Sequence, residues 1–598
     1  MSNLVMGIDL GTTYTCVGVF NQNKIEILEN EHGQKCIPSC VTFCNQEIVV
    51  GKKPQAKKTS NQITISNTKR LIGKTFSEIE EECDTLDYDV IDKDGYPMIE
   101  ITWGEKRVLQ SPHEIASIIL KKVKALVEEK YQQSVENCAI SVPARFNQSE
   151  RDATMTAAKL AGLHVLKLTS EPVAAAKTYG DQYIQDKDHR RILVYDFGGG
   201  TLDVAVISVS KQCYQVEGTN GNKHLGGEDI DALLLSYVLQ DVKKKFPTTP
   251  NTVRLRETLR EKCERVKWDL SFENKSELVY ENILPNQDYS LPITRAFFDE
   301  LCTSFFQAAM TPVYAILEDH SFSKDSIDDV VLVGGTTKIP FIQNMLKDFF
   351  QKPVHKSMNL ECVAYGTTLE AVNLLGLKDK KDLTIEVTPL SLGIETAGTF
   401  RTCIIPRNTT IPHKKTCFFT TDKDDQESVT IKVLEGERFF SKDNHVLGTF
   451  KLNKIPKAPR GKLKIAVTYC IDQNSKLDIC ANVVGYHTEK KLSIQRVDSY
   501  FTDKQNIDKM LEDAKQFETS EKVLATNRKG TTDYLDWLYE MFHTVKEKKI
   551  ASLIELYREE IDWVRANYTL DTYEMDVRRS AFEKKAKEFY VSKKVISS

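Results

Sequence analysis

Residues 5–20 read VMGIDLGTTYTCVGVF, and residues 192–209 read ILVYDFGGGTLDVAVISV. Each stretch runs from an apolar strand through Asp into a turn of Gly and Thr, and then into a second apolar strand. That pattern is typical of a β-hairpin. Because the same hairpin is used twice, the sequence predicts two related lobes that face each other.

The turns of both hairpins are suited to phosphate binding. Gly lets backbone N–H groups approach phosphate oxygens closely, and Thr hydroxyls add further donors. Two such turns would hold a triphosphate from both sides, with Asp9 and Asp196 placed for Mg²⁺ and Asp203 as a third carboxylate. A single turn of this kind is more often an ordinary hairpin, and it is the pair that favours phosphate binding.

Residues 1–380 alternate short strands with Gly turns and helical stretches, which is the pattern of α/β layers. Within them, VVLVGGTTKIPFIQNML (residues 330–346) predicts a buried strand, a Gly-Gly turn and a helix whose N-terminus can hold another part of a nucleotide. The lone GKT at residues 73–75 lacks the upstream Gly of a P-loop, so the sequence does not support that fold.

The pattern changes twice after residue 380. A charged segment at 381–388 leads into residues 389–500, where period-2 alternation predicts a β-rich domain. One face of a predicted strand there carries Leu463, Ile465, Val467, Tyr469 and Ile471. Residues 501–598 predict helices, which begin at a capping box formed by Thr502 and Gln505.

The composition narrows the class of protein. A chain of 598 residues exceeds one hydrophobic core, so about two to four domains are expected. The net charge of -4, from 81 basic and 85 acidic residues, indicates neither a nucleic acid nor a membrane as partner. No export signal or long apolar segment is apparent, so we expect a soluble, unexported protein.

The 14 cysteines are scattered through apolar runs, which fits a reducing compartment. Cys36, Cys40 and Cys44 form the one cluster that suggests a metal site. Such a site would need a fourth ligand, and the sequence offers none at a usual spacing. Buried thiols are therefore the preferred interpretation.

Short motifs along the chain carry a specific resemblance. In chain order they are IDLGTTY, NTKRLIGK, SVPARFN, DFGGGTLDV, LGGEDID, VGGTTKIP, TPLSLGIET, RNTTIP and EGER. In order and spacing they resemble the 70-kDa heat-shock protein family along essentially the whole chain. The resemblance implies a multidomain protein of α/β, β and α parts. These are an actin-like two-lobed nucleotide-binding domain (1–380), an interdomain linker (381–388), a β-sandwich peptide-binding domain (389–500) and a C-terminal helical lid (501–598).

The resemblance also implies roles for single residues. Lys69 becomes the key catalytic candidate, because its ammonium can neutralise charge on the transferred phosphoryl group and orient the attacking water. The implied catalytic set is Lys69, Glu171, Asp196, Thr201 and Asp203. The implied phosphate-binding set is Gly11, Thr12, Thr13, Tyr14, Lys69, Gly198, Gly199, Gly200 and Thr201. The implied adenosine-binding set is Gly227, Glu264, Lys267, Ser271, Gly335, Thr336 and Lys338.

This chain departs from the family pattern near the adenosine. Trp268 and Lys338 stand where the family has Arg, Thr336 stands where it has Ser, and Glu361 stands where it has Asp. A Trp can still stack on adenine, but Lys does not replace a planar, stacking Arg. We therefore expect a nucleotide affinity that differs from the family norm.

In the β-rich domain the resemblance implies a groove that holds an extended peptide through backbone hydrogen bonds and apolar pockets. Its lining positions are Ile394, Thr396, Ala397, Phe419, Val429 and Ile431. Alternation alone favours plain sandwich core at these positions, and it is the resemblance that favours the groove.

Two further features concern coupling between the domains. Pro143 and Arg151 match family positions that relay the nucleotide state, although a strand-ending Pro and an exposed helical Arg are also ordinary structural features. In the linker, Asp382 and Thr384 interrupt the family's apolar run, and Glu386 replaces its Asp. These changes predict weaker docking of the linker onto the first domain.

The implied function is an ATP-dependent chaperone that binds extended apolar segments of unfolded or nascent polypeptides, gated by slow ATP hydrolysis and nucleotide exchange. The implied cofactors are ATP/ADP and Mg²⁺, and the implied partners are a J-domain co-chaperone and a nucleotide-exchange factor. Lys167 and Ser170 replace the family's Arg and Asn near the J-domain surface, which leaves partner choice open. The first motif resembles the eukaryotic cytosolic branch, so we expect a cytoplasmic protein of the stress response, with the nucleus left open.

Two alternatives remain beside this interpretation. The sequence ends in KKVISS, without the EEVD tail of the main cytosolic members, which predicts no tetratricopeptide co-chaperone through the C-terminus. A ribosome-associated or non-cycling partner with weak ATPase activity would fit that ending. A small-molecule kinase on the same actin-like fold ranks last, because it would not explain residues 389–598.

Overall fold

The computed structural model divides into two compact units, one of Met1–Cys44 with Val49–Asp503 and one of Asn45–Ile48 with Lys504–Ser598. The residues that the structure describes are 4–30, 33–44, 47–51, 62–83, 86–103, 106–184, 189–210, 213–250, 252–355, 359–378, 382–396, 400–421, 424–438, 440–459, 461–472, 475–486, 490–493, 530, 533–535, 537–542, 544–545, 551–567 and 572–596.

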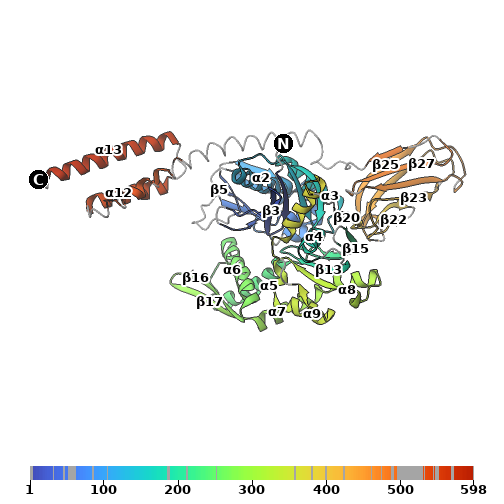
Figure 1. Cartoon of the computed structure of the whole chain (residues 1–598), viewed down its shortest axis with the longest axis horizontal. Coiled ribbons are helices and arrows are strands. Elements are labelled where there is room, and N and C mark those ends of the chain that lie inside the picture. The colour runs from blue at the N-terminus through green and yellow to red at the C-terminus, as the bar shows by residue number, and fades with distance from the viewer. Residues whose placement is uncertain are drawn as a thin grey trace. The chain divides into compact units, whose positions relative to one another are not determined.

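The first hairpin lies in a six-stranded sheet of the first unit (Figure 1). Strand β1 pairs with β11 in parallel and with β2 in antiparallel fashion, and β4 also pairs with β2. Helix α10 packs against β1 and β2. The elements are β12 (His164–Ser170), β11 (Asn137–Val142), β1 (Val5–Leu10), β2 (Tyr14–Asn21), β3 (Lys24–Ile27), β4 (Cys36–Pro38), α2 (Pro112–Tyr131), α3 (Gln148–Leu160) and α10 (Cys362–Leu374).

The second hairpin lies in another six-stranded sheet, whose order is β19-β18-β13-β14-β15-β20. Its strands are β19 (Val354–His355), β18 (Asp329–Val333), β13 (His189–Phe197), β14 (Leu202–Ser210), β15 (Cys213–Asn222) and β20 (Leu383–Ile385). Around it lie α4 (Glu171–Tyr183), α5 (Gly227–Lys245), α6 (Val253–Phe272), α7 (Arg295–Ala308), α8 (Thr311–Asp319) and α9 (Pro340–Phe350).

Strand β13 is buried on both faces. Because successive side chains point to opposite sides of a strand, Leu193, Tyr195 and Phe197 pack into one hydrophobic core, whereas Ile192 and Val194 pack into another. A strand covered by helices on both faces reads as a continuous apolar run, and that is how ILVYDF reads.

Both predicted hairpins are confirmed. In the first, β1 and β2 pair across the turn with Asp9 opposite Cys16. In the second, β13 and β14 pair with Asp196 opposite Asp203. The third predicted element is also confirmed, as strand β18, the short 3-10 helix η4 (Gly335–Lys338) and helix α9.

The remaining elements before the linker are strands that form small sheets of their own and short helices. They are β5 (Val41–Cys44), β6 (Glu47–Val50), β7 (Gln62–Ile65), η1 (Thr68–Arg70), η2 (Phe76–Glu78), α1 (Glu80–Cys83), β8 (Val90–Lys93), β9 (Tyr96–Trp103), β10 (Lys106–Gln110), β16 (Lys275–Leu284), β17 (Gln287–Thr294) and η3 (Lys324–Ser326). Of these, η1 matters most for function, because it contains Lys69 and Arg70.

Residues after the linker form two four-stranded sheets that share one core. One sheet has the order β22-β21-β24-β25 and the other β23-β26-β27-β28. The strands are β21 (Leu392–Thr396), β22 (Phe400–Ile405), β23 (His413–Phe419), β24 (Ser428–Glu435), β25 (His445–Asn453), β26 (Ile465–Ile471), β27 (Leu477–Val483) and β28 (Lys490–Ser493). The predicted apolar face from Leu463 to Ile471 is confirmed as buried core.

The linker contains a short strand of the first domain's second sheet. Strand β20 pairs in parallel with β15, from Cys213 opposite Leu383 to Gln215 opposite Ile385. The backbone of Asp382 exchanges two hydrogen bonds with the Asn373 side chain: its carbonyl accepts from the Asn373 amide at 2.7 Å, and its N–H donates to the Asn373 oxygen at 2.9 Å. The polar substitutions in this segment therefore coexist with pairing to the sheet.

In the second unit, α12 (Ala551–Ala566) and α13 (Thr572–Ile596) pack around a shared apolar cluster. Glu560, on α12, is buried and accepts hydrogen bonds from Arg578 of 2.8 and 2.9 Å and from the Tyr534 hydroxyl of 3.1 Å. Helical structure is thus present in this region. The predicted capping box at Thr502 and Gln505 lies outside the described residues.

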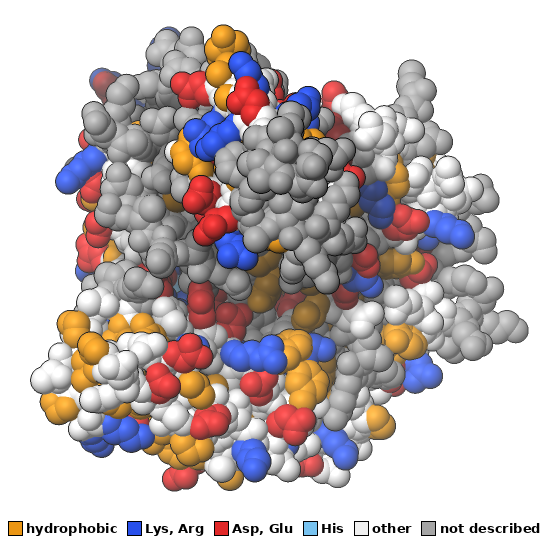
Figure 2. All heavy atoms as spheres, turned by 90° about the vertical axis from the view of Figure 1, so that its left-hand side faces the viewer, with side chains coloured by type: hydrophobic (Ala, Val, Ile, Leu, Met, Phe, Trp, Pro, Cys, Tyr) orange, Lys and Arg blue, Asp and Glu red, His pale blue; other side chains and the backbone are white. Residues whose placement is uncertain are grey.

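Acidic and basic side chains are interspersed on the face drawn in Figure 2, so neither sign of charge dominates that face. In the parts of the chain that the structure describes, no helix is both long and apolar enough to cross a membrane.

Tyr469 joins the two sheets of the sandwich, because its buried hydroxyl donates a 2.8 Å hydrogen bond to the carbonyl of Gly393 on β21. We predict that Tyr469→Phe lowers the local free energy of opening by about 1–3 kcal/mol, since it leaves a buried carbonyl with one partner fewer. Hydrogen exchange of the β21 and β26 amides measures this.

Thr416→Val provides the control, because it also removes one hydroxyl, but from an exposed Thr416–Thr468 pair. Its effect should stay within about 0.5 kcal/mol. Equal losses in the two variants would contradict the assigned role of Tyr469.

Candidate nucleotide site

The two glycine turns meet face to face. A Cβ atom added to Gly199 would lie 1.8 Å from the Thr13 Oγ1, and one added to Gly200 would lie 2.6 Å from the Thr12 Oγ1. A side chain at either position would therefore displace the threonine side chain opposite it. The first and second hairpins are therefore in direct contact, with the hydroxyls of one turn against the backbone of the other.

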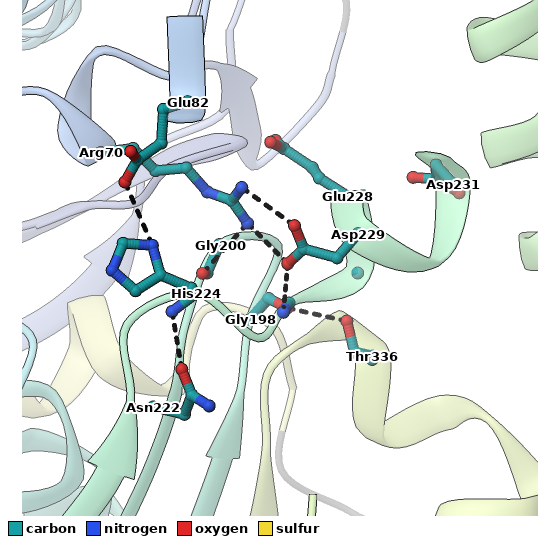
Figure 3. Close-up of polar contacts among 12 residues, drawn as sticks. Arg70, Glu82, Gly198, Gly200, Asn222, His224, Glu228, Asp229, Asp231 and Thr336 are labelled. Carbon is teal, nitrogen blue, oxygen red and sulfur yellow. Dashed lines mark hydrogen bonds and ion pairs between the residues drawn. The ribbon is translucent and has the colours of Figure 1, made fainter. Parts of the chain in front are cut away.

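A third segment holds the second turn. The carbonyl of Gly198 accepts hydrogen bonds from the Thr336 hydroxyl at 2.8 Å and from the Gly227 amide at 3.0 Å. The carbonyl of Gly199 accepts one from the Glu228 amide at 2.9 Å. The turn is thus fixed by η4 on one side and by the N-terminus of α5 on the other (Figure 3).

Arg70 joins the lobes beside these turns. Its guanidinium donates to both carboxylate oxygens of Asp229, at 3.0 and 2.7 Å, and to the carbonyl of Gly200 at 3.2 Å (Figure 3). Asp229 also accepts from the Gly226 amide at 2.7 Å. Two parallel hydrogen bonds of this kind fix the orientation of the two side chains as well as their distance. Arg70 therefore sets the orientation of η1 relative to the second turn.

Lys69 lies next to Arg70 and forms a 2.6 Å ion pair with Glu171, in which the two side chains are 10% and 11% exposed. Three further carboxylates lie in the same electrostatic neighbourhood. Burial and the negative charge of Glu171 raise the pKa of Asp9 and of Asp203 to about 7 each, and they raise the pKa of Asp196 well above its usual range. The positive charge of Lys69 opposes this rise at all three carboxylates but does not cancel it.

This cluster brings together most of the predicted catalytic residues. Asp196 and Asp203 are buried, while Asp9 is half-buried and accepts a 2.9 Å hydrogen bond from Ser141. Raised pKa values mean that the carboxylate charges are poorly compensated by the protein itself. A bound cation would relieve that cost, so the residues fit a Mg²⁺ ion accompanying a nucleotide.

The predicted adenosine-binding residues come from two helices and a turn. Glu264, Lys267 and Ser271 lie on α6, while Gly227 begins α5. Lys267 donates to the Gly227 carbonyl at 2.8 Å and forms a 2.6 Å ion pair with Asp231. Gly335, Thr336 and Lys338 lie in η4, and the Tyr14 hydroxyl donates to Glu264 at 3.3 Å.

Sequence reasoning assigned no role to several residues of this site. They are Arg70, Ser141, Glu228, Asp229 and Asp231. Most of them lie inside the motifs NTKRLIGK and LGGEDID. The sequence therefore marked these segments, but it did not show what their individual side chains do. Only contacts across the chain, such as the 2.9 Å hydrogen bond from Thr13 to Glu228, reveal what these side chains hold.

Comparison with known proteins shows the family of this chain. The family model described as Hsp70 protein matches residues 5–596. The chain belongs to the Hsp70 family. The heat shock 70 kDa proteins of Emericella nidulans and Neurospora crassa are 37% and 38% identical to it, over 97% of this chain and 92% of theirs. The heat shock 70 kDa protein 2 of Paracoccidioides lutzii is 37% identical, over 97% of this chain and 91% of its own.

Membership of the Hsp70 family confirms the main functional predictions. The chain is an ATP-dependent chaperone and an ATPase, with an ATPase region and a substrate-binding region. Members of the family bind nucleotide, generally with Mg²⁺, and they act on unfolded polypeptides together with co-chaperones.

The predicted peptide-binding residues lie in the sandwich, away from the glycine turns in the fold. Ile394 and Ile431 are buried in its core, and Phe419 and Val429 are half-buried against that core. Thr396 is half-buried, and its hydroxyl shares a 2.9 Å hydrogen bond with that of Thr402. Ala397 lies outside the described residues.

Pro143 and Arg151 flank the segment where the first domain meets the sandwich. Pro143 follows β11. Arg151 lies on α3, where its Nε donates a 3.1 Å hydrogen bond to the Phe146 carbonyl. Both are buried rather than exposed. At the start of α3, the backbone amide of Gln148 donates a 3.2 Å hydrogen bond to the carboxylate of Glu435 in the sandwich.

Loss of the Arg70 fork should weaken nucleotide binding. Lys in place of Arg70 keeps the charge but cannot donate to both Asp229 oxygens and the Gly200 carbonyl in one plane. We predict that Arg70→Lys speeds ADP dissociation by about tenfold, equivalent to about 1.4 kcal/mol. Stopped-flow release of a fluorescent ADP analogue measures the rate.

Arg107→Lys is the matched control, because Arg107 pairs with Glu100 at 3.1 Å while 79% exposed. It should leave the dissociation rate unchanged. If both variants released ADP at the parent rate, the Arg70 fork would have no part in holding the nucleotide.

Proposed function

We propose that this chain hydrolyses ATP between its two glycine turns, with Lys69 as the main catalytic residue. The supporting observation is the near-buried Lys69–Glu171 ion pair among the carboxylates of Asp9, Asp196 and Asp203. The ammonium of Lys69 is positioned by Glu171 and would neutralise negative charge on the transferred phosphoryl group. Glu171 and Asp203 would orient the attacking water by accepting hydrogen bonds from it.

In this proposal the amides and hydroxyls of residues 11–14 and 198–201 bind the phosphates from both sides. Asp9 and Asp196 would hold Mg²⁺, which supplies positive charge to the phosphate oxygens when it is bound. Water would mediate these contacts, because Mg²⁺ keeps several waters of its octahedral shell and takes few carboxylates directly.

We extend the proposal to the adenosine and to the peptide. Glu264, Lys267 and Ser271 on one face of α6 would bind the adenosine together with η4. Trp268 on the same helix packs against Phe272, with ring centroids 5.3 Å apart, and is still 44% exposed, so its ring would stack on adenine. An extended peptide would bind at Thr396, Phe419 and Val429, which keep partial exposure, over the core residues Ile394 and Ile431.

Coupling between the two activities would pass through the contact between α3 and the sandwich. Glu435 is buried there, and its carboxylate accepts from the Gln148 amide at 3.2 Å. A second contact joins the Ser149 hydroxyl to the His445 ring at 2.8 Å. Pro143 and Arg151 bracket this contact, which supports a relay role for both.

The partners we propose are a J-domain co-chaperone and a nucleotide-exchange factor, and the C-terminal helices would act as a lid. The scattered cysteines support a cytoplasmic location. A ribosome-associated partner with weak ATPase activity is the second candidate, favoured by the altered linker. Stimulation of hydrolysis by peptide separates the two, because a non-cycling protein would show none.

We predict that Lys69→Ala slows single-turnover ATP hydrolysis by about 10²-fold or more, because a charge that acts on the transferred phosphoryl group is lost. An extended apolar peptide should accelerate hydrolysis by the parent chain. The production of phosphate from a single turnover of radiolabelled ATP measures both effects.

Lys130→Ala serves as the control, since Lys130 is 43% exposed and pairs with Glu26 at 3.6 Å. It should hydrolyse ATP at the parent rate. Normal hydrolysis by Lys69→Ala would refute the catalytic assignment, and unstimulated hydrolysis by the parent would favour the second candidate.

Docking of the sandwich onto the start of α3 should depend on pH, because Glu435 lies in that contact and titrates. Burial raises the pKa of Glu435 to about 7 in the docked form, despite opposition from the Gln148 amide and Lys223. A free Glu has a pKa near about 4.3, so the docked form binds the proton more tightly. Docking should therefore strengthen as pH falls from 8 to 6 and weaken as pH rises through about 7.

Hydrogen exchange of the β20 amides, corrected for the intrinsic effect of pH, reports docking. Glu435→Gln should flatten the pH dependence and keep the docked form at pH 8. If the pH dependence persisted in Glu435→Gln and vanished in His445→Gln, the titrating group would be His445 instead.

A further inference from the structure

Two cysteines oppose each other beside the first glycine turn. Strands β2 and β4 pair in antiparallel fashion with Cys16 opposite Cys36. Their Sγ atoms are 2.8 Å apart. Non-bonded carbon atoms pack at about 3.5–4.0 Å, and a disulfide bond measures about 2.05 Å. The two sulfurs are thus closer than packed side-chain atoms usually lie.

The two thiols differ in access to solvent. Cys16 is 3% exposed, whereas Cys36, the first residue of β4, is partly exposed. A small oxidant can reach Cys36 from solvent, and Cys16 is then already in contact to complete the reaction. This arrangement of one accessible and one adjacent thiol is typical of a reversible redox site.

The pair is tied to the phosphate turn by Ser39, which follows β4. The Ser39 hydroxyl donates to the Gly11 carbonyl at 2.8 Å and lies 2.9 Å from the hydroxyl of Thr15. The Ser39 amide donates to the Thr13 carbonyl at 2.8 Å. Any movement of β4 relative to β2 is therefore passed directly to the first glycine turn.

We propose that Cys16 and Cys36 form a reversible disulfide that regulates nucleotide binding. Its regulatory part rests on the function proposed above, whereas formation of the bond does not. Intracellular disulfides, where they occur, are mostly transient and redox-sensing.

Hydrogen peroxide is the oxidant class that fits the partly exposed Cys36. The Cys36 thiolate attacks one peroxide oxygen, the O–O bond breaks, and Cys36 becomes a sulfenic acid while hydroxide leaves and takes up a proton as water. Cys16, on losing its proton, then attacks the Cys36 sulfur and displaces hydroxide, which leaves as a second water. Two thiols are oxidised and one peroxide is reduced, and a thiol reductant reverses the step.

Closing the bond should disturb the turn. Opposed residues of an antiparallel pair have Cβ atoms about 4.5–5.5 Å apart, whereas a disulfide requires about 3.5–4.5 Å. Oxidation would therefore draw β4 toward β2 and shift Ser39 against the carbonyls of Gly11 and Thr13. The oxidised chain should bind ATP more weakly.

The first experiment maps the bond in the full-length reduced protein after treatment with hydrogen peroxide and alkylation of the remaining thiols. Trypsin cleavage after Lys24, Lys35 and Lys52 gives one peptide with Cys16 and one with Cys36, Cys40 and Cys44. Fragmentation of the linked pair must place the bond on Cys36. Alkylation of both Cys16 and Cys36 after treatment that oxidises other cysteines would overturn the proposal.

The second experiment measures the affinity for a fluorescent ATP analogue before oxidation, after it, and after reduction with dithiothreitol. We expect a loss of about threefold or more, equivalent to about 0.65 kcal/mol, that dithiothreitol restores. Cys36→Ser and Cys36→Thr should form no bond and show no change, while Cys44→Ser should behave as the parent.

The outcomes distinguish the regulatory effect of the disulfide from ATP binding itself. A mapped disulfide with unchanged ATP affinity would overturn the regulatory part of the proposal. Failure of the reduced chain to bind ATP would instead overturn the proposed function, and the mapped disulfide would still stand.

Discussion

The contact between the two glycine turns is the constraint on which the site depends. Thr12 and Thr13 lie so close to Gly199 and Gly200 that a single methyl group on either glycine would clash with their side chains. Each turn ends a strand that is buried in its own sheet, so the position of both sheets is transmitted to the turns. Arg70 and Thr336 then hold the second turn from two further directions.

The short distance between the two glycine turns also explains the electrostatics of the site. The turns bring carboxylates from both hairpins into a desolvated space, where their charges are expensive and their pKa values rise. A stable protein would gain by removing such charges. Their presence together with Lys69 is easier to explain by a bound nucleotide with its cation than by any contribution to folding.

The linker shows a different use of buried charge. Lys167 contacts Glu370 at 2.9 Å and Glu386 at 3.0 Å, and Lys177 contacts Glu370 at 2.7 Å. Although burial acts to raise it, these cations hold the pKa of Glu370 at about 2. A polar linker can therefore dock through ion pairs where an apolar one would dock by burial, and breaking one partner would leave a buried charge uncompensated.

The sequence by itself determined the two hairpins, the strand before the Gly-Gly turn and the apolar face from Leu463 to Ile471. Each of these depends on local periodicity and on the backbone freedom of Gly, which are readable within about ten residues. Motif order also determined the family. The tertiary structure alone decided that Arg70 reaches Asp229, that Cys36 faces Cys16 and not Cys40 or Cys44 across the strand pair, and that Arg151 is buried. These facts depend on contacts between segments up to 159 residues apart, which no local pattern records.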